Sequence, residues 1–324
     1  MDNILTIRDL KVAFQVKGKL AYALDGINID IPRGRIVGIV GESGCGKSMT
    51  AMSIMGLIKN PGKIVGGSID FCGTELTKIS VRDYAKIRGK DISMIFQEPM
   101  TSLNPVVKVG KQVMEAIILH EKISKEEAKM RVIEIFNEVG IPEAEKRFNS
   151  YPHELSGGLR QRVMIGMAMI CKPKLLIADE PTTALDVTIE AQILKLMKKL
   201  CESVGTSIIM ITHNMGVVAE ICDYVYVMYA GRVVESTLTK MLFNETAHPY
   251  TSGLLKSIPT IGKKQDRLYT IKGNVPNILN LPEGCRFVDR CDYAQDICFS
   301  SRPADEYIKD NHMVSCCLLY TSDA

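Results

Sequence analysis

The first seventy residues are dominated by runs in which apolar and polar positions alternate. Residues 4–14 and 21–31 follow this two-residue period, and so does 64–71, as expected of half-buried β-strands. Residues 36–40 are instead continuously apolar, which predicts a fully buried strand. Turn residues separate these runs. We therefore expect the loop that follows Val40 to be embedded among antiparallel strands.

Further along the chain the apolar spacing changes to three and four residues. This spacing runs from 109 to 139 and predicts two helices with no strand between them, so we expect an all-helical insertion. Beyond Val234 the apolar pattern weakens and turn residues multiply. The other elements that the pattern predicts are helices at 49–58, 163–170 and 189–201 and strands at 92–96, 175–179 and 207–211.

Composition limits the classes of protein to consider. The chain has 324 residues, enough for one domain plus an extension, and a net charge of +3 that gives no reason to expect nucleic acid as a partner. No apolar run approaches the ~18 residues that span a bilayer, and residues 1–4 lack the basic start of a signal peptide. We therefore expect a cytoplasmic protein. Its ten cysteines are then better explained as thiols or metal ligands than as disulfides.

Residues 41–48 read Gly-Glu-Ser-Gly-Cys-Gly-Lys-Ser and fit the pattern Gly-x-x-x-x-Gly-Lys-Ser. A buried strand that leads through a glycine-rich turn into a helix aims backbone N–H groups at one point, where a polyphosphate binds. Lys47 is expected to reach the β- and γ-phosphates, and the Ser48 hydroxyl to bind Mg²⁺. The helix start is also expected to favour the thiolate of Cys45. A chance match is the alternative, and the strand and helix on either side argue against it.

Three further predicted strands end in polar groups suited to phosphate chemistry. Gln97 follows one strand, where a carboxamide would lie near Mg²⁺ and the attacking water. Asp179 ends another as a candidate Mg²⁺ ligand, and Glu180 beside it is free to polarise water. His213 follows the third and is expected to face the γ-phosphate. Taken singly, the acidic pair and the histidine each have a structural alternative: exposed acids in a turn, or a histidine with no chemical role.

Two other features are weaker when taken alone. Ser156 is a suitable N-cap, and Gly157 and Gly158 leave backbone amides bare, so residues 155–162 form a second candidate phosphate-binding helix start. The alternative is an ordinary capped helix. Phe14, at a strand end, is a candidate to stack on a purine or else a core aromatic.

In this order, the segments of residues 1–240 resemble the ATPase subunit of ATP-binding cassette (ABC) transporters. The resemblance implies an α/β fold of the P-loop NTPase type: a RecA-like parallel-sheet core, an antiparallel β subdomain, a helical insertion at about 98–155 and a small C-terminal extension at 241–324. Leu159 and Phe14 stand where other residues are commoner, and both keep the bulk of the side chain. The motifs carried over are the adenine-stacking Phe14, Walker A (41–48), the Q-loop Gln97, the signature (155–162), Walker B (175–180), the D-loop (184–186) and the switch histidine His213.

The resemblance also assigns ligands and partners. It implies catalysis by Glu180, His213 and Gln97, and Mg²⁺ binding by Ser48, Gln97 and Asp179. Two such subunits, identical or paralogous, would form a head-to-tail dimer that encloses two ATP molecules. The dimer would bind two permease subunits at the cytoplasmic face of the membrane. The permeases would receive substrate from an extracytoplasmic binding protein. The residues implied to contact nucleotide are Phe14, Gly41, Ser43, Gly44, Cys45, Gly46, Lys47, Ser48, Met49, Ser156, Gly157, Gly158, Gln161 and Asp186.

Three stretches narrow the subfamily. Residues 97–105, 181–188 and 248–251 resemble dipeptide and oligopeptide importer ATPases, although nickel importer ATPases share much of this sequence. The length of the tail beyond residue 240 favours a peptide importer over a nickel importer. A soluble cassette ATPase of DNA repair or translation is an alternative, but those proteins usually carry two cassettes or a long coiled coil. Another alternative is a metal-sensing or redox module in which the cassette is a regulated switch.

The tail contains cysteines at 285, 291, 298, 316 and 317. The short Cys-x₂₋₄-Cys knuckle typical of zinc is absent, and looser spacing suits an iron–sulfur cluster. The pattern Gly-Cys-x-Phe-x-x-Arg-Cys at 284–291, followed by a third cysteine and by His-x-Val-x-Cys at 312–316, resembles the tail of peptide importer ATPases. This match selects Cys316 over Cys317 as the fourth ligand. We predict a structural [4Fe–4S] cluster on Cys285, Cys291, Cys298 and Cys316, with zinc as the alternative. We expect ATP hydrolysis to depend on residues before 240 and largely to survive loss of this cluster.

Overall fold

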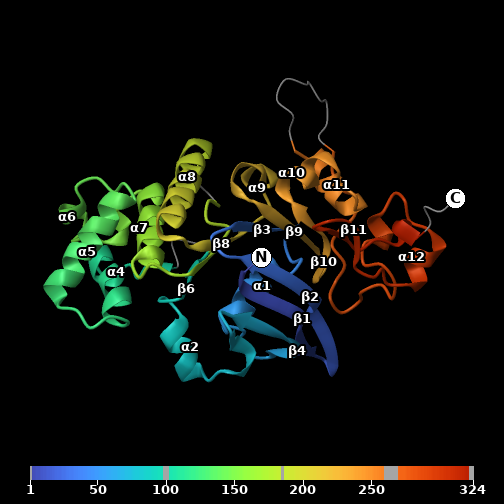
Figure 1. Ribbon diagram of the computed structural model, residues 1–324, viewed down its shortest axis with the longest axis horizontal. Coiled ribbons are helices and arrows are strands. Elements are labelled where there is room, and N and C mark those ends of the chain that lie inside the picture. Colours follow the sequence, from blue (N-terminus) through green and yellow to red (C-terminus); the bar gives the residue numbers. More distant parts are fainter. Residues whose placement is uncertain (1, 98–101, 184–185, 259–268, 321–324) are drawn as a thin grey trace. The chain divides into compact units, whose positions relative to one another are not determined.

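A computed structural model describes residues 2–97, 102–183, 186–258 and 269–320 of the chain (Figure 1). It divides into two compact units. The first comprises residues 1–4, 32–35 and 79–209, and the second comprises 5–31, 36–78 and 210–324. No helix among the described residues is long and apolar enough to cross a membrane.

Helices dominate the first unit, as the three- and four-residue spacing predicts. The helices α4 and α5 both pack against α7, with Val113, Val132 and Phe136 fully buried. Strands β6 and β7 pair in parallel, from Ile92 opposite Leu175 to Ile95 opposite Ala178. The elements are α2 (Val81–Ile87), β6 (Ile92–Ile95), α4 (Val109–Ile118), α5 (Lys125–Glu138), α6 (Ala144–Arg147), α7 (Gly157–Met169), β7 (Leu175–Asp179) and α8 (Val187–Val204).

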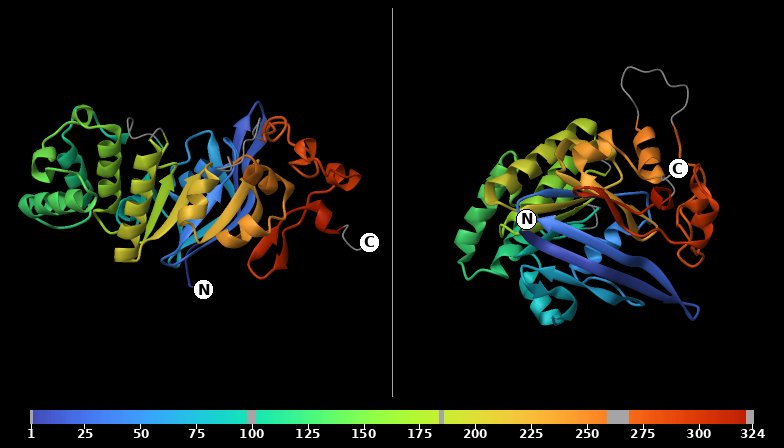
Figure 2. Two further views of the ribbon diagram at one scale, coloured as in Figure 1. Left: turned by 90° about the horizontal axis from the view of Figure 1, so that it is seen from above. Right: turned by 45° about the vertical axis from the view of Figure 1, so that its right-hand side comes forward.

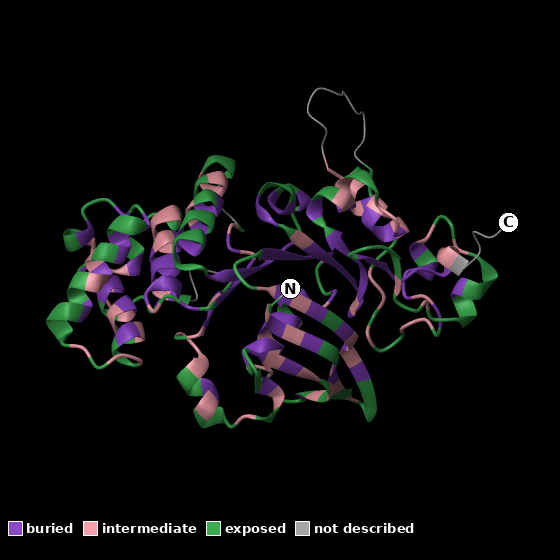
Figure 3. Cartoon of the chain, viewed as in Figure 1, coloured by how far each residue is buried: buried purple, intermediate pink, exposed green. Residues whose placement is uncertain are grey.

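In the second unit the N-terminal strands form an antiparallel sheet in the order β2-β1-β4-β5. Buried residues recur at every second position at the end of β2 (Ile27, Ile29 and Ile31), and exposed and half-buried residues alternate in the middle of β4, whereas register shifts around Lys11 interrupt the pattern in β1. The two-residue pattern is therefore confirmed in part, and Figure 3 colours the sheet by burial. The sheet leaves one face to solvent, which is common for antiparallel strands. Its members are β1 (Asn3–Val16), β2 (Lys19–Pro32), β4 (Gly62–Phe71) and β5 (Thr74–Glu75).

The strand that precedes the Walker A loop belongs to a different sheet. Strand β3 (Ile36–Val40) is buried throughout and pairs in parallel with β9 (Tyr224–Tyr229). The expectation that this loop is embedded among antiparallel strands is therefore wrong. Helix α1 begins at Lys47 and ends at Ile54. The predicted helix, 49–58, therefore begins two residues too late and ends four residues too late.

The C-terminal strands extend the sheet of β3 and β9. Within the second unit the order is β11-β12-β10-β9-β3, with β10, β12 and β11 antiparallel to their neighbours. In Figure 2 the strands β10, β12 and β11 are coloured orange to red. The remaining elements are β8 (Ser207–Thr212, shared between the units), α9 (Met215–Ile221), β10 (Arg232–Leu238), α10 (Thr239–Asn244), α11 (Pro249–Lys256), α12 (Asp296–Ser300), β11 (Glu306–Lys309) and β12 (His312–Val314).

A buried carboxylate ties this C-terminal part together. Glu235 on β10 is fully buried and lies 2.8 Å from His312 Nε2 on β12. It also accepts hydrogen bonds from the backbone N–H groups of Ala247 and His248, at 2.9 and 3.0 Å. Buried carboxylates are costly unless their oxygens are satisfied, so these contacts stabilise the junction of β10, β12 and α11.

Candidate nucleotide-binding site

The Walker A loop is shaped by glycines at its two ends. Gly41 has a φ of +150°, and a Cβ on it would lie 2.2 Å from the Met228 carbonyl oxygen. Gly46, with a φ of +112°, is the N-cap of α1, and a Cβ there would lie 2.8 Å from Leu24 Cδ2. Only glycine fits both positions, because β9 and β2 approach the loop so closely.

Lys47 lies across the inside of this loop. Its side chain is buried, and its Nζ donates to the carbonyl oxygens of Gly41 and Glu42 at 2.7 and 3.1 Å. The residues around it, Ser43, Gly44 and Ser48, are exposed. The Lys47 ammonium beside these exposed loop residues is suited to bind an anion, because it can exchange its carbonyl contacts for phosphate oxygens.

Cys45 differs from the prediction. Its side chain is fully buried, and this burial raises the pKa of the thiol despite the nearby Lys47 ammonium. The expectation that the helix start favours the thiolate is therefore wrong, because loss of hydration outweighs the favourable charge. The carbonyl oxygen of Cys45 accepts a hydrogen bond from Gly231 N at 2.8 Å, which fixes the loop to the β9–β10 turn.

In the first unit, parallel pairing brings two predicted catalytic side chains together. Gln97 and Glu180 follow the neighbouring strands β6 and β7, and Gln97 Nε2 donates to Glu180 Oε2 at 3.0 Å. The same oxygen accepts from Thr183 Oγ1 at 3.0 Å. Glu180 adopts a left-handed backbone, with a φ of +47°, and is half-buried. Asp179, one residue earlier, is buried at the end of β7.

The signature helix begins as predicted. Ser156 caps α7, its Oγ accepting from Leu159 N at 3.4 Å, and Gly157 is exposed. Gln161 is buried, and its Nε2 donates to the Pro181 carbonyl oxygen at 2.5 Å. Its amide is thus used inside the protein, joining α7 to the turn after Walker B, and a direct contact with nucleotide stays a prediction.

The remaining predicted site residues are accessible to different degrees. Asp186 is exposed at the start of α8, whereas Ala184 and Leu185 of the D-loop lie outside the described residues. His213 is exposed directly after β8. Phe14 and Met49 are half-buried, and the Phe14 ring packs so closely on Gly62 that a Cβ there would lie 2.7 Å from Phe14 Cε1.

The tail cysteines lie close together. Cys298 and Cys317 form a small apolar core with Val288, and Cys285 packs against it. Burial raises the pKa of Cys316 to about 11, with further contributions from the thiols of Cys285, Cys291 and Cys298. Burial likewise raises the pKa of Cys317 to about 12, with Cys298 adding to it. Across the described residues no three His, Cys, Asp or Glu side chains are arranged to hold a metal ion.

Sequence reasoning gave no role to four residues that contact the Walker A loop or the adjoining β9–β10 turn. Arg290 Nη1 lies 2.6 Å from Glu42 Oε2, and Glu42 N donates to Tyr250 Oη at 2.8 Å. Arg286 forms an ion pair with Asp25, whose backbone N–H donates to Gly231 O at 3.0 Å. Two signals were available: the stretch 248–251, which contains Tyr250, and the pattern at 284–291, which contains Arg290.

Comparisons with known proteins identify the family of this chain. Residues 24–183 match the ABC transporter family, and residues 234–298 match the oligopeptide/dipeptide transporter C-terminal region. The chain is 52% identical to the oligopeptide transport ATP-binding protein AppD of Bacillus subtilis, over 98% of this chain and 97% of that protein. It is 49% identical to OppD of Escherichia coli, over 94% of this chain and 90% of that protein.

Solved structures show the same fold. A dimeric post-hydrolysis state of the ATP-binding cassette MJ0796 bound to ADP and Pi is 27% identical, with a TM-score of 0.66, and matches over 72% of this chain and 98% of that one. CbiO1 from Clostridium perfringens is 31% identical, with a TM-score of 0.65, over 76% and 92% of the two chains. This chain therefore belongs to the ABC transporter family, as an ATPase cassette followed by an oligopeptide/dipeptide transporter C-terminal region.

Proposed function

We propose that this chain binds and hydrolyses ATP to drive the import of dipeptides or oligopeptides through a membrane complex. The observation that carries the proposal is the joining of a cassette to residues 234–298, which match the oligopeptide/dipeptide transporter C-terminal region. AppD and OppD, at 52% and 49% identity, are themselves named as oligopeptide transport ATP-binding proteins.

The proposed chemistry assigns one role to each group. Lys47 and the loop amides bind the β- and γ-phosphates, while Phe14 stacks on the adenine. Mg²⁺ is assigned to Ser48, Asp179 and Gln97, whose oxygens are ligands of the kind that this ion prefers. The ion would neutralise charge on the transferred phosphoryl group.

Glu180 is the proposed general base for the attacking water. Gln97 and Thr183 both donate to its Oε2 at 3.0 Å and so orient the carboxylate that would receive the proton from water. His213 is assigned to the γ-phosphate. Hydrolysis would then end the ATP-bound state.

We also propose that two ATPase subunits, identical or paralogous, act as a head-to-tail dimer. The chain offers two candidate phosphate-binding helix starts, at Gly46 and at Ser156, and one nucleotide in a monomer has no evident use for both. The signature residues Ser156, Gly157 and Gly158, with Asp186, would close over the partner's nucleotide. The helical insertion would dock on two permease subunits at the cytoplasmic face of the membrane.

The test is reconstitution with permease subunits and a binding protein of the peptide importer type. Peptide-loaded binding protein should stimulate ATP hydrolysis in vesicles that contain the complex. Stimulation by Ni²⁺ and not by peptides would replace the peptide assignment with a nickel importer. A chain that hydrolyses ATP but never copurifies with membrane subunits would instead favour a soluble switch.

We further propose that Cys285, Cys291, Cys298 and Cys316 hold a [4Fe–4S] cluster. The support is the resemblance of the tail to that of peptide importer ATPases and the electrostatic influence that the four thiols exert on one another; the described residues do not form a ready-made metal site, so the thiols would have to move together to hold the cluster. A bound cluster would cross-link the tail. Protein purified without oxygen should be brown and contain about four irons per chain. Colourless protein with one zinc would overturn this.

The fourth ligand is tested by a matched pair of variants. Cys316→Ser should lose iron and colour, whereas Cys317→Ser should keep both. Retention of colour in Cys316→Ser would give the fourth position to Cys317, whose thiol lies next to Cys298 and donates to the Ser301 carbonyl oxygen at 3.7 Å.

A further inference from the structure

The segment between Cys285 and Cys291 carries a buried arginine that grips the Walker A loop. Arg290 makes a two-pronged contact with Glu42: Nη1 lies 2.6 Å from Oε2, and Nη2 lies 3.0 Å from Oε1. The Arg290 side chain is only 4% exposed, and its Nε donates to the Lys272 carbonyl oxygen at 2.7 Å. A planar fork held at both ends fixes the direction of its partner carboxylate as well as its charge.

Glu42 is itself the second residue of the Walker A loop and is held at three points. Arg290 binds its carboxylate, Tyr250 Oη accepts from its N–H at 2.8 Å, and its carbonyl oxygen accepts from Lys47 Nζ at 3.1 Å. One residue therefore separates the tail arginine from the lysine proposed to bind phosphate. A displacement of Glu42 would move one of the two carbonyl oxygens that position Lys47.

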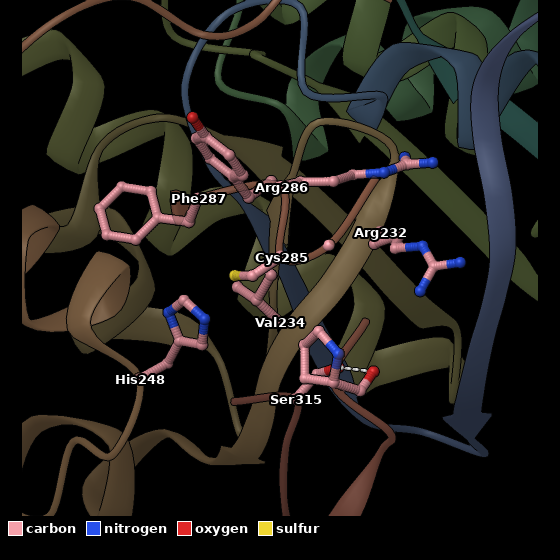
Figure 4. A pocket seen from close by; sticks show the side chains of 10 residues that line it. Arg232, Val234, His248, Cys285, Arg286, Phe287 and Ser315 are labelled. Carbon is pink, nitrogen blue, oxygen red and sulfur yellow. Dashed lines mark hydrogen bonds between the residues drawn. The ribbon is translucent and has the colours of Figure 1, made fainter. Parts of the chain in front are cut away.

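A second contact runs from Arg286 in the same segment. Arg286 donates to the Ala230 carbonyl oxygen and lies 2.5 Å from Asp25 Oδ2. Ala230 lies in the turn between β9 and β10, and the next residue of this turn, Gly231, donates to the Cys45 carbonyl oxygen at 2.8 Å. In Figure 4 the Arg286 and Arg232 side chains extend to one side of Cys285, and Phe287 and His248 lie on the other.

Aromatic packing keeps the segment against the loop between these two contacts. The Phe287 ring meets Tyr229 edge-on at 5.2 Å between ring centres and lies 5.4 Å from Tyr250. Tyr229 and Tyr250 are fully buried and are 4.7 Å apart. Because Tyr250 also holds the Glu42 backbone, this cluster joins the tail to the loop through a rigid, close-packed contact.

We propose that Arg290 is a positioning residue for nucleotide binding, and that residues 285–291 set the conformation of the Walker A loop through it. The tail is then part of the ATP-binding apparatus, contrary to the expectation that nucleotide chemistry depends only on residues before 240. The inference rests on ATP binding at this loop. Coupling of this kind is reciprocal, so bound MgATP should in turn order residues 285–291.

The first test measures the MgATP dissociation constant of full-length variants. Arg290→Ala should bind about tenfold more weakly, because the loop loses a buried charged partner. Arg290→Lys keeps the charge without the fork and should recover part of the loss. The matched control is Lys272→Ala, which removes an exposed pair with Asp292 at 3.2 Å in the same region and should bind as the wild type does. Wild-type affinity in Arg290→Ala would overturn the proposal.

A second test separates positioning from simple stability. Hydrogen exchange of residues 284–291 should slow when MgATP is added to the wild type, and this slowing should be lost in Glu42→Gln, which retains the size of the side chain. Equal slowing in both proteins would contradict the coupling, and Glu42→Gln serves if Arg290→Ala does not fold. If Lys47→Ala loses MgATP binding and Arg290→Ala keeps it, only this inference fails; a wild type that does not bind MgATP would remove the proposed function instead.

Discussion

The Walker A loop and the Gln97–Glu180 group are built in opposite ways. The loop has a buried lysine and a buried cysteine, and it is braced from behind by Arg290, which is 4% exposed. Glu180 is only half-buried, and its two partners, Gln97 and Thr183, are both exposed. A net hydrogen bond contributes about 1 kcal/mol and less where water competes, so the second arrangement is far easier to change.

This difference suits the two tasks. A preformed loop binds phosphate without a further loss of conformational entropy. A carboxylate held by two exposed side chains can exchange these partners for water and phosphate when the nucleotide arrives. The contrast therefore predicts that changes at the loop affect mainly binding and stability, and that changes at Glu180 affect mainly the rate of hydrolysis.

The largest expected effect is on hydrolysis, in Glu180→Gln. The variant should bind MgATP as the wild type does and hydrolyse it ~10²-fold or more slowly, because the amide cannot accept the proton from water. It should also accumulate as an ATP-bound dimer. Turnover and size-exclusion chromatography with ATP measure both, and wild-type turnover would show that Glu180 is not the base.

Lys47→Ala should act on binding instead. Removing a charged donor to phosphate is expected to weaken MgATP binding roughly 10- to 100-fold, the range for charge-assisted hydrogen bonds. Equilibrium titration with a fluorescent ATP analogue measures it. Undiminished affinity would contradict the assignment of the loop and remove one side of the comparison.

The rigidity of the loop is tested by two glycines. Gly41→Ala should lower the free energy of unfolding by about 3 kcal/mol, because its Cβ would lie 2.2 Å from the Met228 carbonyl oxygen. Gly44→Ala is the control: its φ of +81° costs about 1 kcal/mol, but no atom lies within 4 Å of the added Cβ. Urea unfolding of both variants gives the comparison, and equal losses would argue against a tightly packed loop.

The smallest effect concerns thiol chemistry. Burial raises the pKa of Cys45, so little thiolate is present at neutral pH, and alkylation of Cys45 should be slow and should accelerate as the pH rises. The exposed Cys72 is the internal control and should react first. Peptide mapping after a short alkylation at pH 7 distinguishes them. Preferential labelling of Cys45 would mean that the loop opens readily.

The sequence by itself determined the local elements and the residues at their ends. Apolar periodicity sets which face of a strand or helix is buried, so β3 and β7 lie where the pattern predicts them. Gly-x-x-x-x-Gly-Lys-Ser likewise encodes its own turn. The adjacency of Gln97 and Glu180 needed one further step, the parallel pairing of β6 and β7, which the family resemblance implied.

Tertiary structure alone decided how these elements are supported. Arg290 and Glu42 are 248 residues apart, and no period or spacing connects them. The burial of Cys45 and Gln161 depends on what packs over them. Charge and residue type alone therefore predicted the wrong direction for the pKa shift of Cys45, and the resemblance assigned to nucleotide a Gln161 amide that donates to the Pro181 carbonyl oxygen. The parallel partner of β3 was also misjudged from its neighbours in sequence, since β9 follows it by nearly two hundred residues. Local patterns fix which face is buried, and only the folded chain fixes what covers it.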